Sequence, residues 1–479
     1  MYTQSMAASL PTEPASVFVT RRRELSKRLG GRPAVVFAGG MRARNYPANV
    51  YEYRADSHFL YLVGMGLVDA ALVVDATHSR LYLTPPADDD PLWHGTLPTW
   101  DELAAATGVD EIRPADELAA AIGADVCTLP SADPLTRARQ RALLGRTWDP
   151  TRPTKVGDLG ATDLALADAM IALRLCHDDA ALAGIERAVE ATTAAHLAGM
   201  AATRPGLHEH DIRAAMEREL TARGMPCAYG SIVTVHGEIL HNTSYHHRLG
   251  DHDMVLADLG GEYRGWASDV TRTWPVSGAF TATQRALYDI VLQAQLDAIA
   301  KVTPGTRYRD VHLTASRTLA QGLVDEGILK GDPDGLVERG AHALFFPHGV
   351  GHLLGLDVHD MEDLGDRAGY APDRTRSEQF GLGYLRLDRD LMPGMVVTIE
   401  PGLYMVDAIV DDPALAGPFD ADGTLDREAM GRFADVRGIR IEDDVLCTPT
   451  QPRVLTAAIP KTAEAVEAVV GTAAAGDAR

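Results

Sequence analysis

Five residues that can bind a metal ion occur in one ordered series along the second half of the chain: Asp258, Asp269, His352, Glu400 and Glu442. Four carboxylates and one imidazole form a ligand set that hard divalent cations accept, and the set is larger than one ion needs. The series therefore predicts two metal ions that share bridging carboxylates. Such a pair activates water at neutral pH and stabilises a developing oxyanion, so metal-assisted hydrolysis is the leading expectation.

The first two ligands follow a strand pattern. Asp258 ends the apolar run Met254–Asp258, and Asp269 comes eleven residues later, after a glycine turn. Two adjacent antiparallel strands would place both carboxylates side by side. Buried like charges this close repel unless protons or cations lie between them. A turn aspartate and an exposed strand aspartate would explain this pair equally well.

The other ligands lie in the strings FPHGVGHLLGLDVHD, VVTIEPGLY and GIRIEDD. The first string contains two more histidines, His348 and His359. Glu400 ends an apolar strand, where a carboxylate is costly without a counter-charge. Glu442 shares one strand face with Arg440 by the alternation of side chains, and a salt-bridged pair on an edge strand is the alternative interpretation.

Composition limits the possible partners and compartments. A chain of 479 residues is too long for one ordinary core, so we expect two domains. A net charge of −22 repels phosphate backbones and anionic lipids, which argues against nucleic acid and membrane as partners. The cysteines are far apart, at Cys127, Cys176, Cys227 and Cys447. Their spacing, the lack of a recognisable signal peptide and the lack of a long apolar run predict a cytoplasmic protein.

Periodicity predicts an α/β arrangement in the first 150 residues. Residues 1–17 are expected to be frayed, and residues 148–153 form a proline-bearing linker. The expected strands are Ala34–Phe37, Phe59–Val63, Ala70–Val74 and Leu81–Leu83. The expected helices are Arg21–Leu29, Trp100–Ala106 and Ala115–Ile122.

The remainder of the chain alternates helix pairs with strands, twice over, which predicts an α+β domain. The expected helices are Leu164–Leu175, Asp179–Ala202, Glu209–Arg223, Thr281–Val302 and Tyr308–Glu326. The expected strands are Ser231–Val235, Met254–Asp258, Ala267–Trp274, Val396–Ile399 and Ile439–Val445.

With these strings in view, the chain resembles the Xaa-Pro peptidases of the pita-bread metallopeptidase superfamily, which comprise aminopeptidase P and prolidase. The resemblance is close over residues 175–470 and looser over residues 20–125, through YRADSHFLYLVG and LWHG. It implies an α/β N-terminal domain over residues 1–160, similar to that of aminopeptidase P. It also implies an α+β pita-bread catalytic domain over residues 161–479.

The resemblance also implies roles for the five ligands. Asp258 and Asp269 would bind one metal ion. Asp269 would bind the second ion together with His352 and Glu400, and Glu442 would bridge both. The implied ions are two Mn²⁺, and the carboxylate-rich ligand set leaves Co²⁺ and Zn²⁺ open.

Further residues match catalytic and substrate-binding positions of the family. A hydroxide between the metals would attack the scissile carbonyl, and Glu400 would pass its proton toward the leaving proline nitrogen. His359 would stabilise the oxyanion, and His241 would contact the substrate at the scissile peptide. His348 and Arg440 would support the site. Tyr229 is a candidate for the proline pocket, with ordinary core packing as the alternative.

Two regions depart from the usual bacterial pattern. The loop VHGEILHN carries Asn242 where the family usually has tyrosine, and His177 stands where lysine is frequent. The segment Gly365–Met392 is longer than in typical bacterial aminopeptidase P and resembles the prolidase equivalent. There, an arginine matching Arg386 binds the carboxylate of a dipeptide. An exposed Arg386 paired with Asp388 or Asp390 is the alternative.

The expected function is therefore that of an Xaa-Pro aminopeptidase acting on proline-containing peptides. Prolidase, restricted to dipeptides, is the first alternative, and a catalytically inactive peptide-binding module is the second. Creatine hydrolysis and methionine aminopeptidase activity fit less well, because the first works without metals and the second lacks a large N-terminal domain. The family also implies a homodimer or homotetramer, with Trp93 either at a subunit contact or buried within its own domain.

Overall fold

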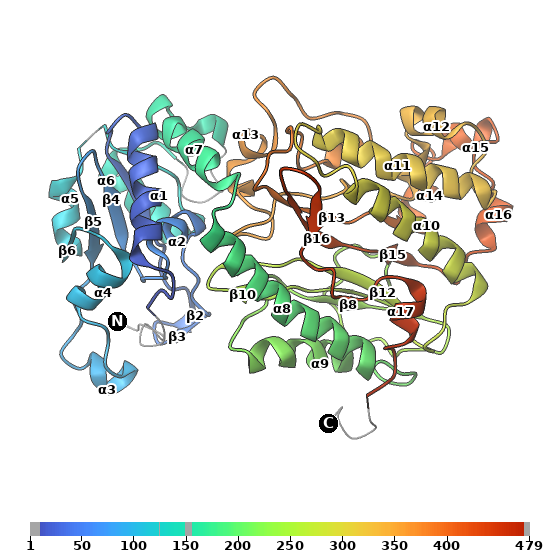
Figure 1. Ribbon diagram of the computed structural model, residues 1–479, viewed down its shortest axis with the longest axis horizontal. Helices are drawn as coiled ribbons and strands as arrows, with labels where there is room; N and C mark the ends of the chain where they lie inside the picture. Colours follow the sequence, from blue (N-terminus) through green and yellow to red (C-terminus); the bar gives the residue numbers. More distant parts are fainter. Residues whose placement is uncertain (1–9, 124, 149–155, 474–479) are drawn as a thin grey trace. The chain divides into compact units, whose positions relative to one another are not determined.

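The computed structural model describes residues 10–123, 125–148 and 156–473. Residues 1–9 of the expected frayed segment and residues 149–153 of the expected linker lie outside these ranges. The described residues up to Leu175, together with Met361–Ala368, form a first compact unit. Cys176–Asp360 and the described residues from Gly369 onward form a second unit (Figure 1). The expected domain boundary between residues 160 and 161 stays a prediction, because compactness alone does not define a domain.

The first unit contains a mixed five-stranded sheet in the order β6-β5-β4-β1-β7. Its strands are β1 (Ala34–Phe37), β4 (Ala71–Val74), β5 (Ser79–Leu83), β6 (Glu111–Pro114) and β7 (Cys127–Thr128). Strand β4 is antiparallel to β1 and β5, whereas the β1–β7 and β5–β6 pairs are parallel. Buried Val35, Phe37 and Val73 of this sheet belong to one hydrophobic core.

Helices surround this sheet, as the α/β expectation requires. They are α1 (Ala15–Arg28), α2 (Ser57–Val63), α4 (Trp100–Thr107), α5 (Leu118–Ala121), α6 (Pro134–Leu144) and α7 (Ala161–Arg174). A short helix, α3 (Asp90–His94), carries Trp93, whose side chain is 65% exposed. This exposure excludes burial of Trp93 within its own unit, and a role at a subunit contact stays a prediction.

One predicted strand of the first unit is wrong. Residues Phe59–Val63 belong to helix α2, and every residue of α2 is buried. A run that is apolar on all sides has no period that separates a buried strand from a buried helix. The capping contacts at the two ends of α2 explain why the segment forms a helix and not a strand. The Asp56 side chain accepts the N–H of His58 at the start, and Gly64 ends the helix in the left-handed conformation.

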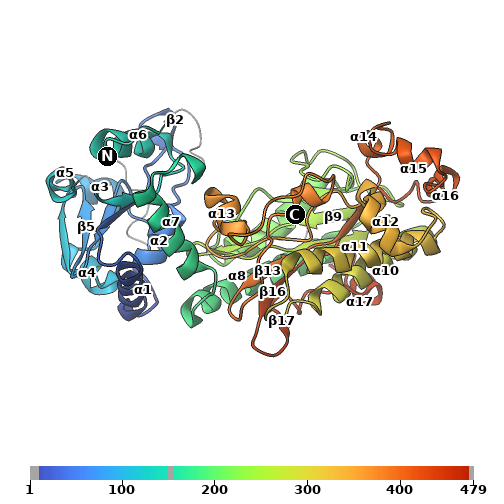
Figure 2. The same ribbon diagram turned by 90° about the horizontal axis from the view of Figure 1, so that it is seen from above.

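Two helix pairs of the second unit confirm the expected periodicity. Helix α8 (Asp179–Ala202) packs on α9 (Glu209–Ala222), and α10 (Ala282–Ile299) packs on α11 (Tyr308–Asp325). Caps set two of the helix starts, because Asp178 accepts the N–H of Ala181 and Thr281 accepts that of Gln284. In the view of Figure 1 strands of the unit are drawn between the two helix pairs, and Figure 2, seen from above, draws strands on one side of α10 and α11. None of the helices in the described ranges is long and apolar enough to cross a membrane.

The strands of the second unit form several small sheets. The first contains β8 (Ile232–Thr234), β9 (Met254–Asp258) and β12 (Thr271–Pro275). The second contains β13 (Val396–Ile399), β16 (Asp443–Cys447) and β17 (Pro452–Val454). Two-stranded pairs join β10 (Glu262–Tyr263) to β11 (Trp266–Ala267) and β14 (Gly402–Tyr404) to β15 (Gly438–Arg440).

Two expected strands are each split by a break. The expected strand Ala267–Trp274 becomes β11 and β12, with Asp269 in the gap. The expected strand Ile439–Val445 becomes β15 and β16, which pair in different sheets, with Glu442 in the gap. Glu400 likewise lies between β13 and β14. Residues at such breaks are free of the strict alternation of a strand, so their side chains can turn toward one point.

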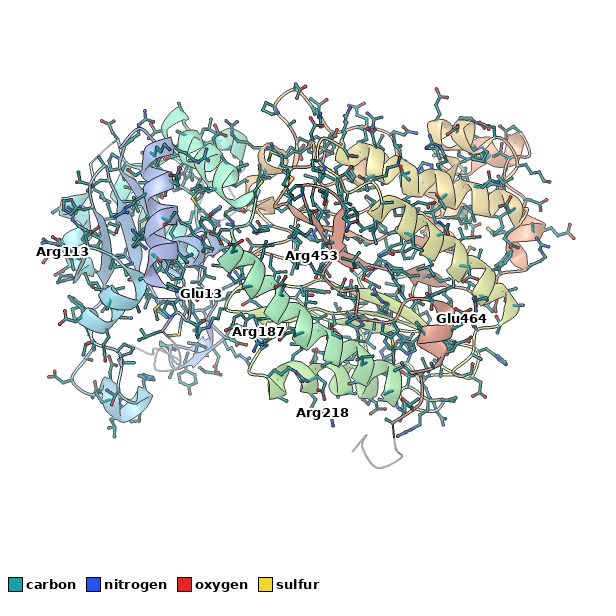
Figure 3. The ribbon with its side chains drawn as sticks, viewed as in Figure 1. Glu13, Arg113, Arg187, Arg218, Arg453 and Glu464 are labelled. Atoms are coloured by element: carbon teal, nitrogen blue, oxygen red, sulfur yellow. The ribbon has the colours of Figure 1, made fainter. Side chains whose placement is uncertain are left out.

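Many charged side chains lie on the surface, as Figure 3 shows for Arg187, Arg218 and Glu464. Exposed pairs such as Arg187 with Glu190 each contribute roughly 0–1 kcal/mol. The few charges buried inside the second unit are therefore the more informative ones.

Candidate metal centre

Tyr229 connects the first two candidate ligands. Strand β9 pairs with β12 so that Asp258 faces Thr271, which brings Asp269 close to Asp258. The Tyr229 hydroxyl is within hydrogen-bonding distance of Oδ1 of Asp258 and lies 2.5 Å from Oδ1 of Asp269. One hydroxyl hydrogen cannot serve both carboxylates, so this contact leaves one oxygen short of a proton or cation. Burial and then the charges of both aspartates raise the pKa of Tyr229 well above its usual value.

Three further groups converge at one point. One ligand atom each of Asp269, His352 and Glu442 lies within 4.8 Å of the others. His352 Nε2 lies 3.4 Å from Oδ2 of Asp269 and 3.5 Å from Oε1 of Glu400. His352 Nδ1 lies 3.0 Å from the carbonyl oxygen of Leu353, which can only accept, so Nδ1 carries the hydrogen. Nε2 is therefore the nitrogen that faces the carboxylates.

Burial dominates the electrostatics of this cluster. It raises the pKa of Asp258 to about 6 and that of Glu400 to about 7, although Arg440 and His352 respectively oppose the change. It raises the pKa of Glu442 well above the usual value, reinforced by Asp269 and Glu400. Burial also acts to raise the pKa of Asp269, but His352 and Tyr229 outweigh it and the pKa falls. Burial lowers the pKa of His352, but Asp269 and Glu400 raise it to about 9.

Arg440 holds one side of the cluster in place. Its Nη2 donates to Oδ2 of Asp258 at 2.6 Å, and its Nε donates to the Thr271 hydroxyl at 2.9 Å. Thr271 in turn donates to Oε2 of Glu442 at 2.7 Å. Arg440 Nη1 also lies 3.2 Å from the Tyr404 hydroxyl. The expected alternative, an ion pair of Arg440 and Glu442 on an edge strand, is wrong, because Arg440 pairs with Asp258 across two elements.

Sequence reasoning missed two members of this network, Thr271 and Tyr404. The Tyr404 hydroxyl lies 2.9 Å from Nε2 of His348, which joins His348 to Arg440. Position offers a weak signal in each case, since Thr271 comes two residues after Asp269 and Tyr404 ends the string TIEPGLY. Neither position identifies the residues that Thr271 and Tyr404 contact, because those residues lie far away along the chain.

The donor set fits divalent cations. The four carboxylates of Asp258, Asp269, Glu400 and Glu442 face two basic side chains, Arg440 and His352. Burying such an excess of negative charge is costly unless cations or protons balance it. Carboxylate-rich oxygen donors with one imidazole suit ions such as Mn²⁺.

The remaining predicted residues lie around this cluster. The His359 ring centroid is 4.2 Å from that of His352. Burial, Arg440 and Arg386 lower the pKa of His241. Burial is also the main reason that the pKa of His348 falls to about 3, and Arg440 and Arg386 lower it further. The Arg386 charge is therefore close enough to act on both histidines.

The two aspartates considered as partners of Arg386 bind other arginines, and a buried asparagine holds the unusual loop. Asp388 binds Arg307 at 2.7 Å, and Asp390 binds Arg374 at 2.7 Å. In the loop, Nδ2 of buried Asn242 donates to the Thr234 hydroxyl at 2.8 Å. The asparagine that replaces the family tyrosine thus ties the loop to the end of β8.

Comparisons with known proteins agree with this geometry. Residues 183–449 match metallopeptidase family M24, and residues 18–127 match the N-terminal domain of aminopeptidase P. The Xaa-Pro aminopeptidase of Escherichia coli is 33% identical over 95% of this chain and 97% of its own. The human Xaa-Pro dipeptidase is 30% identical over 95% of this chain and 93% of its own.

A solved structure confirms the fold. Proline aminopeptidase P II from Yersinia pestis superposes with a TM-score of 0.78 at 32% identity, covering 95% of this chain and 99% of that one. The expected α/β N-terminal domain and α+β pita-bread catalytic domain are thus confirmed. The chain belongs to metallopeptidase family M24 and carries the N-terminal domain of aminopeptidase P.

Proposed function

We propose that the chain removes the N-terminal residue from peptides that carry proline in the second position. The observation that carries this proposal is the buried excess of carboxylates over basic side chains around Asp269. The similarity to Xaa-Pro aminopeptidases over nearly the whole chain supports the choice of substrate. Asp258, Asp269, His352, Glu400 and Glu442 would hold two divalent ions, with Mn²⁺ as the favoured metal.

Bound ions would supply Lewis acidity, which activates water and polarises the scissile carbonyl. The chain's own residues would move the protons. Glu400, which lies between β13 and β14 at the cluster, would accept a proton from the attacking water at its carboxylate and pass it on. That proton is needed at the proline nitrogen, because a tertiary amide nitrogen must be protonated to leave as an amine.

His359 and His241 would act on the substrate. His359, packed against the His352 ring, would donate a hydrogen bond to the developing oxyanion. His241 would contact the scissile peptide from the loop that Asn242 ties down. His348, Tyr404 and Arg440 form a connected chain of polar contacts that would keep Asp258 oriented. The hydroxyl of Tyr229, a candidate for the proline pocket, contacts Asp258 and Asp269, and we propose that it orients those carboxylates.

A dipeptidase is the second candidate, and Arg386 is the observation that favours it. Arg386 lies close enough to His241 and His348 to lower the pKa of both. From there its guanidinium would bind the free carboxylate of a dipeptide, because a planar fork of donors matches a carboxylate. The similarity of the chain to the human Xaa-Pro dipeptidase also supports a dipeptidase as the second candidate.

Hydrolysis assays on chelator-stripped protein decide between the candidates. Ala-Pro-Ala, Ala-Pro and Ala-Ala-Ala are incubated with and without added Mn²⁺. Mn²⁺-dependent cleavage of Ala-Pro-Ala, with Ala-Ala-Ala intact, is the expected result. Cleavage of Ala-Pro alone would identify a dipeptidase, and Arg386→Ala should then raise KM for Ala-Pro. A chain that binds these peptides without cleaving any of them would be the inactive module.

We further propose that the protein is a cytoplasmic homodimer or homotetramer. Sedimentation of the full chain tests its assembly state.

A further inference from the structure

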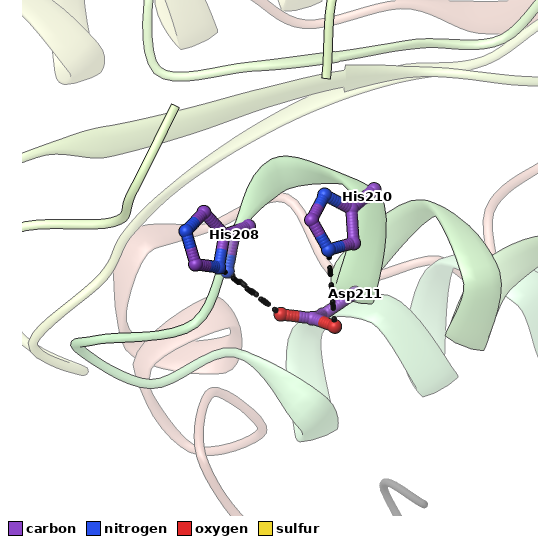
Figure 4. Close-up of side chains that lie close together, drawn as sticks. All are labelled: His208, His210 and Asp211. Atoms are coloured by element: carbon purple, nitrogen blue, oxygen red, sulfur yellow. Dashed lines mark hydrogen bonds and ion pairs between the residues drawn. The ribbon is translucent and has the colours of Figure 1, made fainter. Parts of the chain in front are cut away.

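A second group of metal-binding side chains lies at the start of α9 and shares no residue with the carboxylate centre. It consists of His208, His210 and Asp211, with one ligand atom of each within 4.8 Å of the others. Figure 4 shows both imidazoles directed at the Asp211 carboxylate. Nδ1 of His208 lies 3.8 Å from Oδ2 of Asp211, and Nε2 of His210 lies 3.6 Å from Oδ1.

The backbone that carries these side chains is anchored by Glu209. The Glu209 side chain is fully buried and accepts four hydrogen bonds: from the Thr234 hydroxyl at 2.9 Å, Val235 N at 2.9 Å, and His247 N and Nδ1 at 3.1 and 3.0 Å. The backbone N–H of Glu209 also donates to the carbonyl of His247. Because Glu209 points inward and is held there, its neighbours His208 and His210 start from a fixed backbone and extend outward.

His210 has the proton arrangement of a metal ligand. Its Nδ1 lies 3.0 Å from the carbonyl oxygen of Tyr245, which can only accept a hydrogen bond. Nδ1 therefore carries a hydrogen, and Nε2 is the nitrogen that faces Asp211. Ligating histidines commonly donate their other N–H to a carbonyl in this way.

The Asp211 carboxylate is oriented as well. Its Oδ2 accepts the backbone N–H of His208 at 2.8 Å, which leaves Oδ1 facing His210. The side chains of His208, His210 and Asp211 are 43%, 58% and 39% exposed, so an ion can reach them from solvent. The two rings are nearly parallel, 9° apart, and they must tilt to point at one ion. Their exposure permits this tilt.

We propose that His208, His210 and Asp211 form a surface site for a borderline transition-metal ion, with Zn²⁺ the best match. Two imidazoles and one carboxylate are a ligand set that zinc takes with water in the fourth position. The ligand chemistry differs from the carboxylate centre, where oxygen donors dominate. The bound ion would connect the first turn of α9 more firmly to Tyr245, through His210. This site does not depend on the proposed peptidase activity.

Equilibrium dialysis of the full chain against Zn²⁺, followed by metal analysis, tests the site. The parent protein is compared with His208→Gln, His210→Gln and His252→Gln. His252 is an exposed histidine of the same unit outside both clusters, so it serves as the matched control. Zinc bound by the carboxylate centre is common to all four proteins. We expect His208→Gln and His210→Gln each to bind one Zn²⁺ fewer per chain than the parent and His252→Gln.

Equal zinc content in all four proteins would overturn the site. The same loss in His252→Gln would also overturn it, since it would indicate scattered binding to surface histidines. Thermal unfolding by circular dichroism checks that each variant is folded. Because the readout is bound zinc and not turnover, failure of the peptidase proposal leaves this test unaffected.

Discussion

Glu442 and Asp443 are neighbours in the chain, both carboxylates are buried, and their surroundings are opposite. Asp443 contacts two cations, Arg272 at 2.7 Å and Lys461 at 2.6 Å. Burial acts to raise its pKa, but Arg272 and Lys461 lower the pKa to about 2. Around Glu442, burial and the carboxylates of Asp269 and Glu400 act together to raise the pKa.

We call the network around Asp443 finished, because its negative charge is balanced by Arg272 and Lys461. We call the carboxylate cluster around Glu442 unfinished, because burial and neighbouring carboxylates leave its negative charge unbalanced. Asp443 also accepts hydrogen bonds from Gln295 and Thr456, so its charge is balanced and its oxygens are bonded. Such a network needs nothing from outside. The carboxylates around Glu442 outnumber their basic partners, and an added cation is what would complete them. We therefore expect Asp443 to contribute to stability and its neighbour Glu442 to contribute to metal binding.

The largest effect should come from removing Asp269, the ligand of the unfinished network that is expected to bind both metal ions. Asp269→Ala removes the carboxylate that contacts Tyr229 and His352 together. We expect metal affinity to fall by more than ~100-fold, since even residues behind metal ligands are worth about 10–100-fold. Turnover of Ala-Pro-Ala should be lost with it. Metal analysis after dialysis measures the amount of bound metal, and Asp289→Ala, at an exposed position, serves as the control. Normal metal content in Asp269→Ala would remove the two-metal model.

Breaking the finished network should instead cost stability. Lys461→Met leaves the buried Asp443 carboxylate with one cation in place of two. Removing one partner of a buried ion pair costs about 3–5 kcal/mol of unfolding free energy when the other charge is left unbalanced, and because Arg272 remains we expect the lower end of that range. Urea unfolding measures this loss, and Lys301→Met, at an exposed position, should change little. If both variants unfold alike, Lys461 does not balance Asp443.

His359→Ala should separate metal binding from catalysis within the unfinished network. His359 packs on the ring of His352 and is not one of the five candidate ligands. We expect kcat to fall about 10²–10³-fold, as for the loss of one oxyanion donor, while bound metal is retained. Steady-state kinetics on metal-loaded protein provides the measurement. A fall in metal content that matches the fall in kcat would assign His359 to the ligands.

The smallest effect concerns a finished pair in the first unit, His58 with Asp363, whose Nε2 and Oδ2 lie 3.0 Å apart. Burial and the charge of Arg174, whose Nη1 lies 3.0 Å from Nδ1 of His58, lower the pKa of His58, but Asp363 outweighs them and the pKa is raised. The native state then binds more protons than the unfolded state, so this contribution is full below pH ~6.5 and is lost as pH rises through the folded pKa. Because the Asp363 side chain is 48% exposed, water screens the pair, and we expect about 1.5 kcal/mol or less, the lower end for a hydrogen bond to a charged group.

Urea unfolding of parent and His58→Gln at pH 6 and pH 9 tests this pair. The difference in unfolding free energy between the two proteins should be larger at pH 6 than at pH 9. A difference that grows with pH would contradict the sign of the pKa change.

Local signals predicted much of the secondary structure. Helix α8 and strands β9 and β13 have the bounds that periodicity predicts, because each is amphipathic or uniformly buried over a length typical of its type. The prediction failed for Phe59–Val63, where burial on all sides removes the period. It also failed where a strand passes from one sheet to another, because pairing partners and not local preference decide where a strand ends.

The order of ligand-type residues, each beside glycine or a strand end, determined the family, the reaction class and the candidate ligands of this protein. Only the tertiary structure decided how these residues interact. It joins Tyr229 to two aspartates and Arg440 to Asp258. It gives Asp443 two cations, whereas the carboxylates of Asp269 and Glu400 surround Glu442. The physical reason is that the charge balance of a buried carboxylate depends on partners within a few ångströms, and those partners lie far away in sequence.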